Sequence, residues 1–269
     1  MGDVYATITE ADETVQSRLA DVMELRAAEL QQRAMLEDYL RDLPLPSEAR
    51  VLEVGCGTGA VARVLAARSG IASVVGIDPS PVFVERARAL AGDTGNLSFV
   101  LGDGRDLPFE DRSFHAVVCH TSLCHIPGPE RVLAEAARVT ADDGWLAIFD
   151  GDYATTTVAI SPADPLQACA DAAIRALVHD PFLVRRLAAL VRDAGCAVVR
   201  LRSHGYVETG RPDYLLTIID RGADAMATAG VLGRPAAEAL KAEARRRVAQ
   251  GLFFGHIAYA SVIARARGG

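Results

Sequence analysis

One short stretch restricts the fold of this chain more than any other, the run from Val51 to Gly59 that reads VLEVGCGTG. An apolar segment followed by three closely spaced glycines is typical of a β-strand, a tight turn and a helix. Gly55 permits the turn, Gly57 lets a ligand approach the backbone, and Gly59 lets the helix pack on the strand. The N–H groups at the helix start can bind a polar or anionic ligand. By itself the turn also satisfies the looser dinucleotide pattern, with Ala60 in last place.

Short apolar segments alternate with helices through the first 150 residues. Near-continuous apolar strands separated by helices indicate a parallel sheet covered on both faces, so we expect an α/β, Rossmann-like doubly wound fold. Five strands are expected at Arg50–Val54, Ser73–Ile77, Leu97–Leu101, His115–Cys119 and Trp145–Phe149. The helices between them include Gly59–Arg68, Pro81–Ala91 and Pro129–Thr140.

The two ends of the chain have a different pattern. Apolar residues between Leu19 and Ala34 recur at helical spacing, and Pro44 and Pro46 end that helix. Beyond residue 150 we expect a helical stretch over 165–194, a strand over 197–207, helices over 212–229 and 235–250, and a strand over 252–265. The sequence thus predicts an N-terminal helical cap (1–46) and a larger domain (47–269), with helical lid insertions at about 154–194 and 211–250.

Two carboxylates follow the neighbouring strands. Asp78 ends the second expected strand, about 20 residues after Gly55, where a carboxylate can bind a ribose diol. Asp103 follows the third strand, and its carboxylate can accept a hydrogen bond from an adenine amino group. Because the carboxyl ends of parallel strands meet at one edge of the sheet, the three loops are expected to form one ligand site.

These motifs, in their order and spacing, resemble those of class I S-adenosylmethionine (SAM)-dependent methyltransferases. The resemblance is strongest to the ubiquinone/menaquinone-type (type 11) small-molecule branch. It covers about residues 45–150 and, in outline, the last two strands. It implies a seven-stranded, mostly parallel sheet with the last strand antiparallel, SAM as cofactor and S-adenosylhomocysteine as product. The motifs that carry it are EVGCGTG from Glu53, GIDPS from Gly76, GDGRDLPF from Gly102 and SFHAVVC from Ser113.

The resemblance also implies a role for each matching residue. The methionine end of the cofactor would lie against Glu53, Gly55, Gly57 and Gly59. The ribose would be bound by Asp78, with Pro79 and Ser80 along the wall, and the adenine would contact Asp103 and Gly104. The segment from His120 to Leu123, which includes Thr121, would pass under the sulfonium.

Candidates for a general base follow the fourth and fifth strands. The family often has a histidine at the place of His125, and a neutral imidazole can take a proton from a hydroxyl, an amine or an acidic carbon. The alternative is that His125 only packs under the cofactor. Asp150, Asp152 and Tyr153 are expected at the mouth of the site, where one of them orients substrate or acts as a base, or all belong to a solvated loop.

Metal and disulfide chemistry are not indicated. His120 replaces the Asp or Asn that metal-dependent O-methyltransferases tend to carry there, and the nearby His and Cys spacing is no zinc signature, so no metal is expected. The five cysteines are scattered, which favours reduced thiols.

Composition excludes other classes. The chain has 28 basic and 35 acidic residues, a net charge of −7, which argues against a nucleic-acid-binding surface. No apolar run is long enough to span a bilayer, and the polar, acidic start does not resemble a signal peptide. A cytoplasmic location is therefore expected, and homodimer formation stays open.

The insertions should roof the cofactor cleft and enclose a small, apolar acceptor. The first hypothesis is methyl transfer to O or N, less favourably C, of a small metabolite in secondary metabolism. The alternatives are other SAM-dependent chemistry such as cyclisation, a non-catalytic SAM-binding partner protein, and an NAD-dependent oxidoreductase. Glu53, the glycine register and the strand count argue against the last of these.

Overall fold

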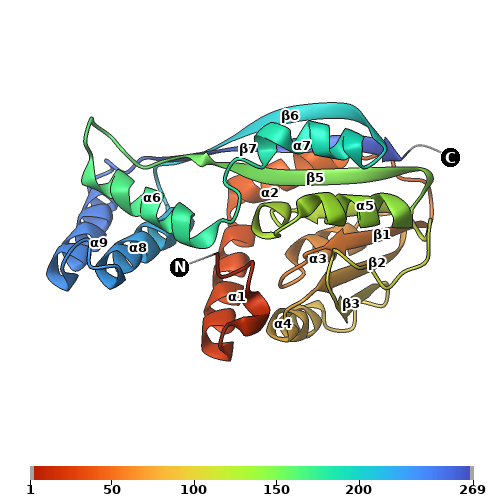
Figure 1. Ribbon diagram of the computed structural model, residues 1–269, viewed down its shortest axis with the longest axis horizontal. Coiled ribbons are helices and arrows are strands. Elements are labelled where there is room, and N and C mark those ends of the chain that lie inside the picture. Colours follow the sequence, from red (N-terminus) through yellow and green to blue (C-terminus); the bar gives the residue numbers. More distant parts are fainter. Residues whose placement is uncertain (1–2, 267–269) are drawn as a thin grey trace.

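The computed structural model describes residues 3–266, and within them a single seven-stranded sheet has the order β3-β2-β1-β4-β5-β7-β6 (Figure 1). Neighbouring strands among β1 to β5 are parallel, whereas β7 is antiparallel to both β5 and β6. The expected topology is therefore confirmed. The strands are β1 (Ala49–Val54), β2 (Ile71–Asp78), β3 (Leu97–Leu101), β4 (Phe114–His120), β5 (Thr140–Thr157), β6 (Cys196–Glu208) and β7 (Gly255–Ala266).

The helices that pack on the sheet include α3 (Ala60–Ala66), α4 (Pro81–Ala91), α5 (Pro129–Val139) and α7 (Val184–Asp193). Local sequence explains where they begin. Ser80 caps α4 by accepting a hydrogen bond from the Phe83 N–H at 3.1 Å, and Pro81 occupies the first turn. The apolar residues of β1 and β4 are almost fully buried, as expected for central strands covered on both faces.

The N-terminal segment forms two helices where the periodicity predicted one. α1 (Glu13–Ala28) and α2 (Leu30–Arg41) are separated at Glu29, whose backbone is extended (φ −62°, ψ 129°). A short 3₁₀ turn, η1 (Ile8–Glu10), precedes α1, and Asp12 caps α1 through the Val15 N–H. α1 lies against α4 and α8, which brings it over the carboxyl edge of the sheet.

Three further helices gather at one end of the long strands β5, β6 and β7, on the left of Figure 1. They are α6 (Pro165–Leu177), α8 (Asp213–Thr228) and α9 (Arg234–Ala249), named here the lid. α6 and α8 cross so closely that a Cβ added at Gly222 would lie 1.7 Å from the Cys169 carbonyl oxygen. Only glycine fits at that crossing.

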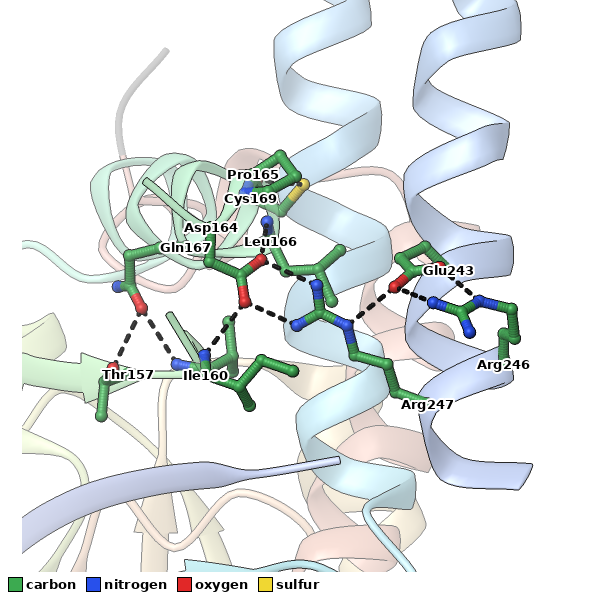
Figure 2. Close-up of polar contacts among 11 residues, drawn as sticks. Thr157, Ile160, Asp164, Pro165, Leu166, Gln167, Cys169, Glu243, Arg246 and Arg247 are labelled. Atoms are coloured by element: carbon green, nitrogen blue, oxygen red, sulfur yellow. Dashed lines mark hydrogen bonds and ion pairs between the residues drawn. The ribbon is translucent and has the colours of Figure 1, made fainter. Parts of the chain in front are cut away.

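An ion-pair network ties α9 to the start of α6 (Figure 2). The Arg247 guanidinium donates to both carboxylate oxygens of Asp164, at 2.6 and 3.0 Å, and its Nε donates to Glu243. Asp164 also caps α6 by accepting from the Leu166 N–H. The Asp164 side chain is fully buried, so the paired geometry is required to offset its desolvation.

The helical stretch expected over 165–194 is two helices with different partners. Pro181 lies between them, and proline does not continue a helix. α6 packs against α8, whereas α7 packs against β6 and β7. The division into a cap and lid insertions with the predicted boundaries stays a prediction. No helix within residues 3–266 has the length and apolar character needed to cross a membrane.

Candidate active site

Two adjoining cavities lie at the carboxyl edge of the parallel strands. The large cavity, about 470 Å³, is bounded by α1, α2, α3, the lid and the loop after β4. The small cavity, about 160 Å³, is bounded by the loops after β2, β3 and β4. The residues that line both are Tyr5, Met23, Gly55, Gly57, Thr121 and His125. The glycine turn and the loop after β4 therefore form the junction between the two cavities.

The glycine turn has the strained backbone that the sequence predicts. Gly55 and Gly57 have φ of +69° and +51°, which favour glycine, and a Cβ at Gly55 would lie 2.6 Å from the Ser122 Cβ. Gly59 (φ +75°) has a different task. It lines neither cavity, and a Cβ there would lie 2.5 Å from the Phe99 ring. Gly59 permits close helix packing rather than ligand contact.

Glu53 is the most unusual acid of the site. It lies at the end of β1 in the wall of the large cavity and is 2% exposed. Its Oε2 is buried and has no hydrogen-bond partner among the described residues. Burial, together with the negative charge of Asp78, raises the pKa of Glu53 to about 8. A buried acceptor without a donor calls for a ligand that supplies one.

Asp78 holds the turn from the end of β2. Its Oδ2 accepts the Gly57 N–H at 2.9 Å, and its Oδ1 accepts the Ser80 N–H at 3.0 Å. Burial raises the pKa of Asp78 to about 6, although both hydrogen bonds favour the charged form. Asp78 and Pro79 also line the small cavity. The carboxylate thus supports the glycine turn and contributes to the ligand wall.

Asp103 and Gly104 form the opposite side of the small cavity. Asp103 makes a bidentate pair with Arg105, with Nη2 2.7 Å from Oδ2, and this pair lowers the pKa of Asp103. A Cβ at Gly104 would lie 2.5 Å from the Val54 Cγ1, so only glycine allows the loop to approach β1. Asp103 therefore faces the cavity as a carboxylate.

His120 and Thr121 end β4. The His120 ring stacks on Phe149 with centroids 4.7 Å apart, and its Nδ1 lies 3.0 Å from the Tyr39 hydroxyl. Burial holds the pKa of His120 well below its ordinary value, so the ring is neutral. Thr121 has a φ of +49°, and its hydroxyl accepts a hydrogen bond from Arg26. His120 lines the large cavity.

His125 ends a 3₁₀ turn, η2 (Leu123–His125), and lies at the junction of both cavities. Its Nδ1 is 2.9 Å from the Asp3 carboxylate. The Asp3 side chain is fully buried and also accepts the N–H groups of Tyr5 and His179. Because an ionised carboxylate only accepts hydrogen bonds, Asp3 selects the His125 form that carries a proton on Nδ1.

The acids expected after the fifth strand lie within β5 and line neither cavity. Asp150 is fully buried, lines neither cavity, and accepts the N–H groups of Cys124 and Gly151. Its carboxylate supports the loop after β4, because a buried charge needs such donors. Asp152 pairs with Arg185 instead. Tyr153 alone reaches the large cavity, with its ring 6.4 Å from that of His125.

Sequence reasoning missed Asp3, Tyr5, Arg26 and Arg221, all of which lie at or beside the cavities. None belongs to a motif. Asp3 and Tyr5 precede η1, Arg26 lies on α1 and Arg221 lies on α8, so each reaches the site through tertiary packing. Tyr214 of α8 also lines the large cavity. Within residues 3–266, no three His, Cys, Asp or Glu side chains gather as metal ligands. All five cysteines are buried.

The residues present fit the cofactor that the sequence resemblance implies. The unpartnered Glu53 Oε2 is an acceptor for a donor-bearing, cationic group, and Gly55 and Gly57 keep the adjoining space open. The small cavity presents the carboxylates of Asp78 and Asp103, which suit hydroxyl and amino donors. SAM carries all of these groups.

Comparison with known proteins agrees with this fit. Residues 52–148 match a family model described as a methyltransferase domain, type 11. Methyltransferase GfsG of Streptomyces halstedii is 33% identical over 170 residues, which are 62% of this chain and 59% of GfsG. The 27-O-demethylrifamycin SV methyltransferase of Amycolatopsis mediterranei is 34% identical over 151 residues, 55% of this chain and 48% of that protein. The chain thus spans about half the length of these curated relatives.

Solved structures share the fold across most of the chain. The [4+2]-cyclase SpnF has a TM-score of 0.55 at 23% identity, covering 88% of this chain and 82% of SpnF. Geranyl diphosphate C-methyltransferase from Streptomyces coelicolor A3(2) has a TM-score of 0.54 at 15% identity, covering 87% of this chain and 79% of that one. Residues 52–148 thus match the type 11 methyltransferase domain, and the glycine turn and the sheet topology agree with the class I SAM-dependent methyltransferase fold.

Proposed function

We propose that this protein transfers the methyl group of SAM to an oxygen or nitrogen of a small metabolite. The observation that carries the proposal is the position of His125, which lines both the small cavity and the large cavity. A base at that junction is within reach of the cofactor on one side and of the methyl-accepting substrate on the other. SAM, when bound, supplies an electrophilic methyl group on a sulfonium.

On the cofactor side, this chain contributes binding and orientation. Asp78 and Asp103 would bind the ribose and adenine donors, and Glu53 would pair with the positive methionine end. Each of these residues lies at a strand end or in the loop that follows a strand. Positioning of two reactants supplies about 7–11 kcal/mol of barrier reduction, so this part of the site is expected to carry most of the rate.

On the acceptor side, His125 would remove a proton from the attacking hydroxyl or amine. Asp3 keeps the Nδ1 proton in place, which leaves the Nε2 lone pair to accept. A general base contributes about 10²–10⁴-fold to the rate. Tyr153 lines the same cavity and would orient the acceptor. Asp150, which is buried behind the loop, would act only by supporting it.

The acceptor pocket suits a small, largely apolar molecule. Ile174 and Leu177 of α6 and Ile218 of α8 line the large cavity and limit the access of water. One relative is named for 27-O-demethylrifamycin SV and another is a tocopherol O-methyltransferase, which supports O-methylation in the metabolism of small natural products. The roofed pocket and the net charge of −7 disfavour nucleic acid as a substrate.

The test uses SAM with an isotope-labelled methyl group and a panel of phenols, alcohols and amines. We expect a product that carries the label, together with release of S-adenosylhomocysteine. A product without the label would show other SAM chemistry, such as cyclisation, and would overturn the proposal. Titration calorimetry adds an independent check, since binding of NADH without binding of S-adenosylhomocysteine would favour an oxidoreductase.

A further inference from the structure

Arg26 and Arg221 line the large cavity, and neither forms an ion pair with any residue from 3 to 266. Arg26 lies on α1, and Arg221 lies on α8 of the lid. The contrast is Arg63, another cavity residue, which makes a bidentate pair with Glu24 at 2.8 and 3.0 Å. Arg33 of α2 also lines the cavity without an ion pair to any described residue, but it is exposed. Arg26 and Arg221 therefore add positive charge to the cavity that no ion pair within residues 3–266 neutralises.

The surroundings of Arg26 are aromatic. Its neighbours include Tyr5, Tyr153, Tyr214 and Tyr259, and it donates a hydrogen bond to the Thr121 hydroxyl. Burial keeps the Tyr153 and Tyr259 phenols neutral, because it raises the pKa of both well above the ordinary value. A phenol is a weak partner for a guanidinium in a site of low dielectric.

Asp3 and Asp150, two buried acids beside the cavity, are already occupied, and Glu53 in the cavity wall is assigned to the positive end of the cofactor. Asp3 accepts from His125 and from two backbone N–H groups, and Asp150 accepts from Cys124 and Gly151. Arg221 reaches the cavity from α8 and is hydrogen-bonded to the Tyr5 hydroxyl. The two arginines, from separate elements, thus face a shared space bounded by tyrosines and aliphatic side chains.

We propose that Arg26 and Arg221 bind a carboxylate on the acceptor, which is otherwise apolar and ring-containing. This inference rests on the proposed function, in which the cofactor occupies the small cavity and the glycine turn. A carboxylate matches the planar donor geometry of guanidinium and gives charge-assisted hydrogen bonds. The positive sulfonium of the cofactor strengthens the preference for an anion. Both arginines line the large cavity and not the small one.

The test measures binding of two probes that differ in one charge, 3-hydroxy-2-naphthoate and 3-hydroxy-2-naphthamide. The full-length protein is first saturated with S-adenosylhomocysteine, so that the carboxylate of the cofactor already occupies its own place. We expect the acid to bind about tenfold more tightly than the amide, and Arg221→Gln and Arg26→Gln each to bring the ratio to about twofold or less. Arg18→Gln, an exposed position on α1, is the matched control and should keep the ratio.

Equal affinity for the two probes, or no binding of either, would overturn the inference. So would a tenfold ratio that survives Arg221→Gln. The affinity for S-adenosylhomocysteine is measured separately in each variant. If Arg26→Gln and Arg221→Gln abolish it while the acid preference stays, the arginines serve the cofactor and the inference is wrong. Failure of the wild type to bind S-adenosylhomocysteine would instead refute the proposed function.

Discussion

The two cavities are built in different ways. Apart from the N-terminal segment that covers it, the small cavity takes its wall from loops after consecutive strands, and it presents carboxylates and backbone groups. The large cavity shares the glycine turn and the loop after β4, and it adds residues from α1, α2, α3, α6 and α8 that include guanidinium groups, phenols and aliphatic side chains. The difference indicates that residues of local motifs form most of the proposed cofactor site. The proposed acceptor site depends on the tertiary packing of elements far apart in the chain.

The largest expected effect is at the junction. His125→Ala should lower turnover about 10²–10⁴-fold, because no base then removes the proton of the methyl-accepting substrate. The affinity for S-adenosylhomocysteine should change less than about twofold. Steady-state kinetics with an acceptor from the labelled-SAM screen and calorimetry measure the two quantities. His115→Gln, which lies in neither cavity, is the control. An unchanged rate would remove His125 as the base.

Asp3→Asn should have a smaller effect on the same reaction. The amide keeps the size of the side chain but no longer restricts Nδ1 of His125 to the role of donor. We expect kcat to fall about tenfold with little change in KM or in the melting temperature. A purely structural role would instead lower the melting temperature and leave kcat of the folded fraction unchanged.

Gly222→Ala should destabilise the packing of the lid. The added Cβ would overlap the Cys169 carbonyl, so the α6–α8 crossing must widen, at a cost of about 1–3 kcal/mol. Denaturant unfolding measures this loss. Gly205→Ala, where a Cβ meets nothing within 4 Å, is the matched control. Equal stability of both variants would show that the lid tolerates wider packing.

Glu53→Gln should change how stability depends on pH. Burial raises the pKa of Glu53 from 4.5 to about 8, so between these values the folded state holds a proton that the unfolded state has lost. Wild-type stability should therefore fall as pH rises from 5 to 8, with Asp78 adding to the same trend. The variant should be more stable than wild type at pH 8, on the order of 1–3 kcal/mol, with no such gain at pH 5. Thermal unfolding at both values tests this.

The sequence predicted the sheet well because apolar runs and glycine turns are local signals. β3 and α4 have the expected bounds, and the ends of β1, β2 and β4 differ by at most two residues. β5 continues to Thr157, well past the expected end at Phe149, because its pairing with β7 extends it. The break at Glu29 has no glycine or proline to mark it.

Some residues of the candidate site could likewise be predicted from local motifs, and others could not. The residues of the glycine turn and of the loops after β2 and β3 were found from their motifs, and the roles implied for them stay predictions. Asp3 could not be found, because its contact with His125 joins distant parts of the chain. Asp150 was misplaced, because the position after a strand does not reveal whether a side chain faces the cavity or the buried loop beside it.

Calorimetric titration of S-adenosylhomocysteine into two variants tests the central claim most directly. Asp78→Ala removes the carboxylate that holds the glycine turn, and Arg221→Gln removes a charge from the large cavity alone. We expect Asp78→Ala to weaken the binding of S-adenosylhomocysteine about tenfold or more, and Arg221→Gln to change it less than about twofold. The reverse order, or equal losses in both variants, would contradict a cofactor site built separately from the acceptor site.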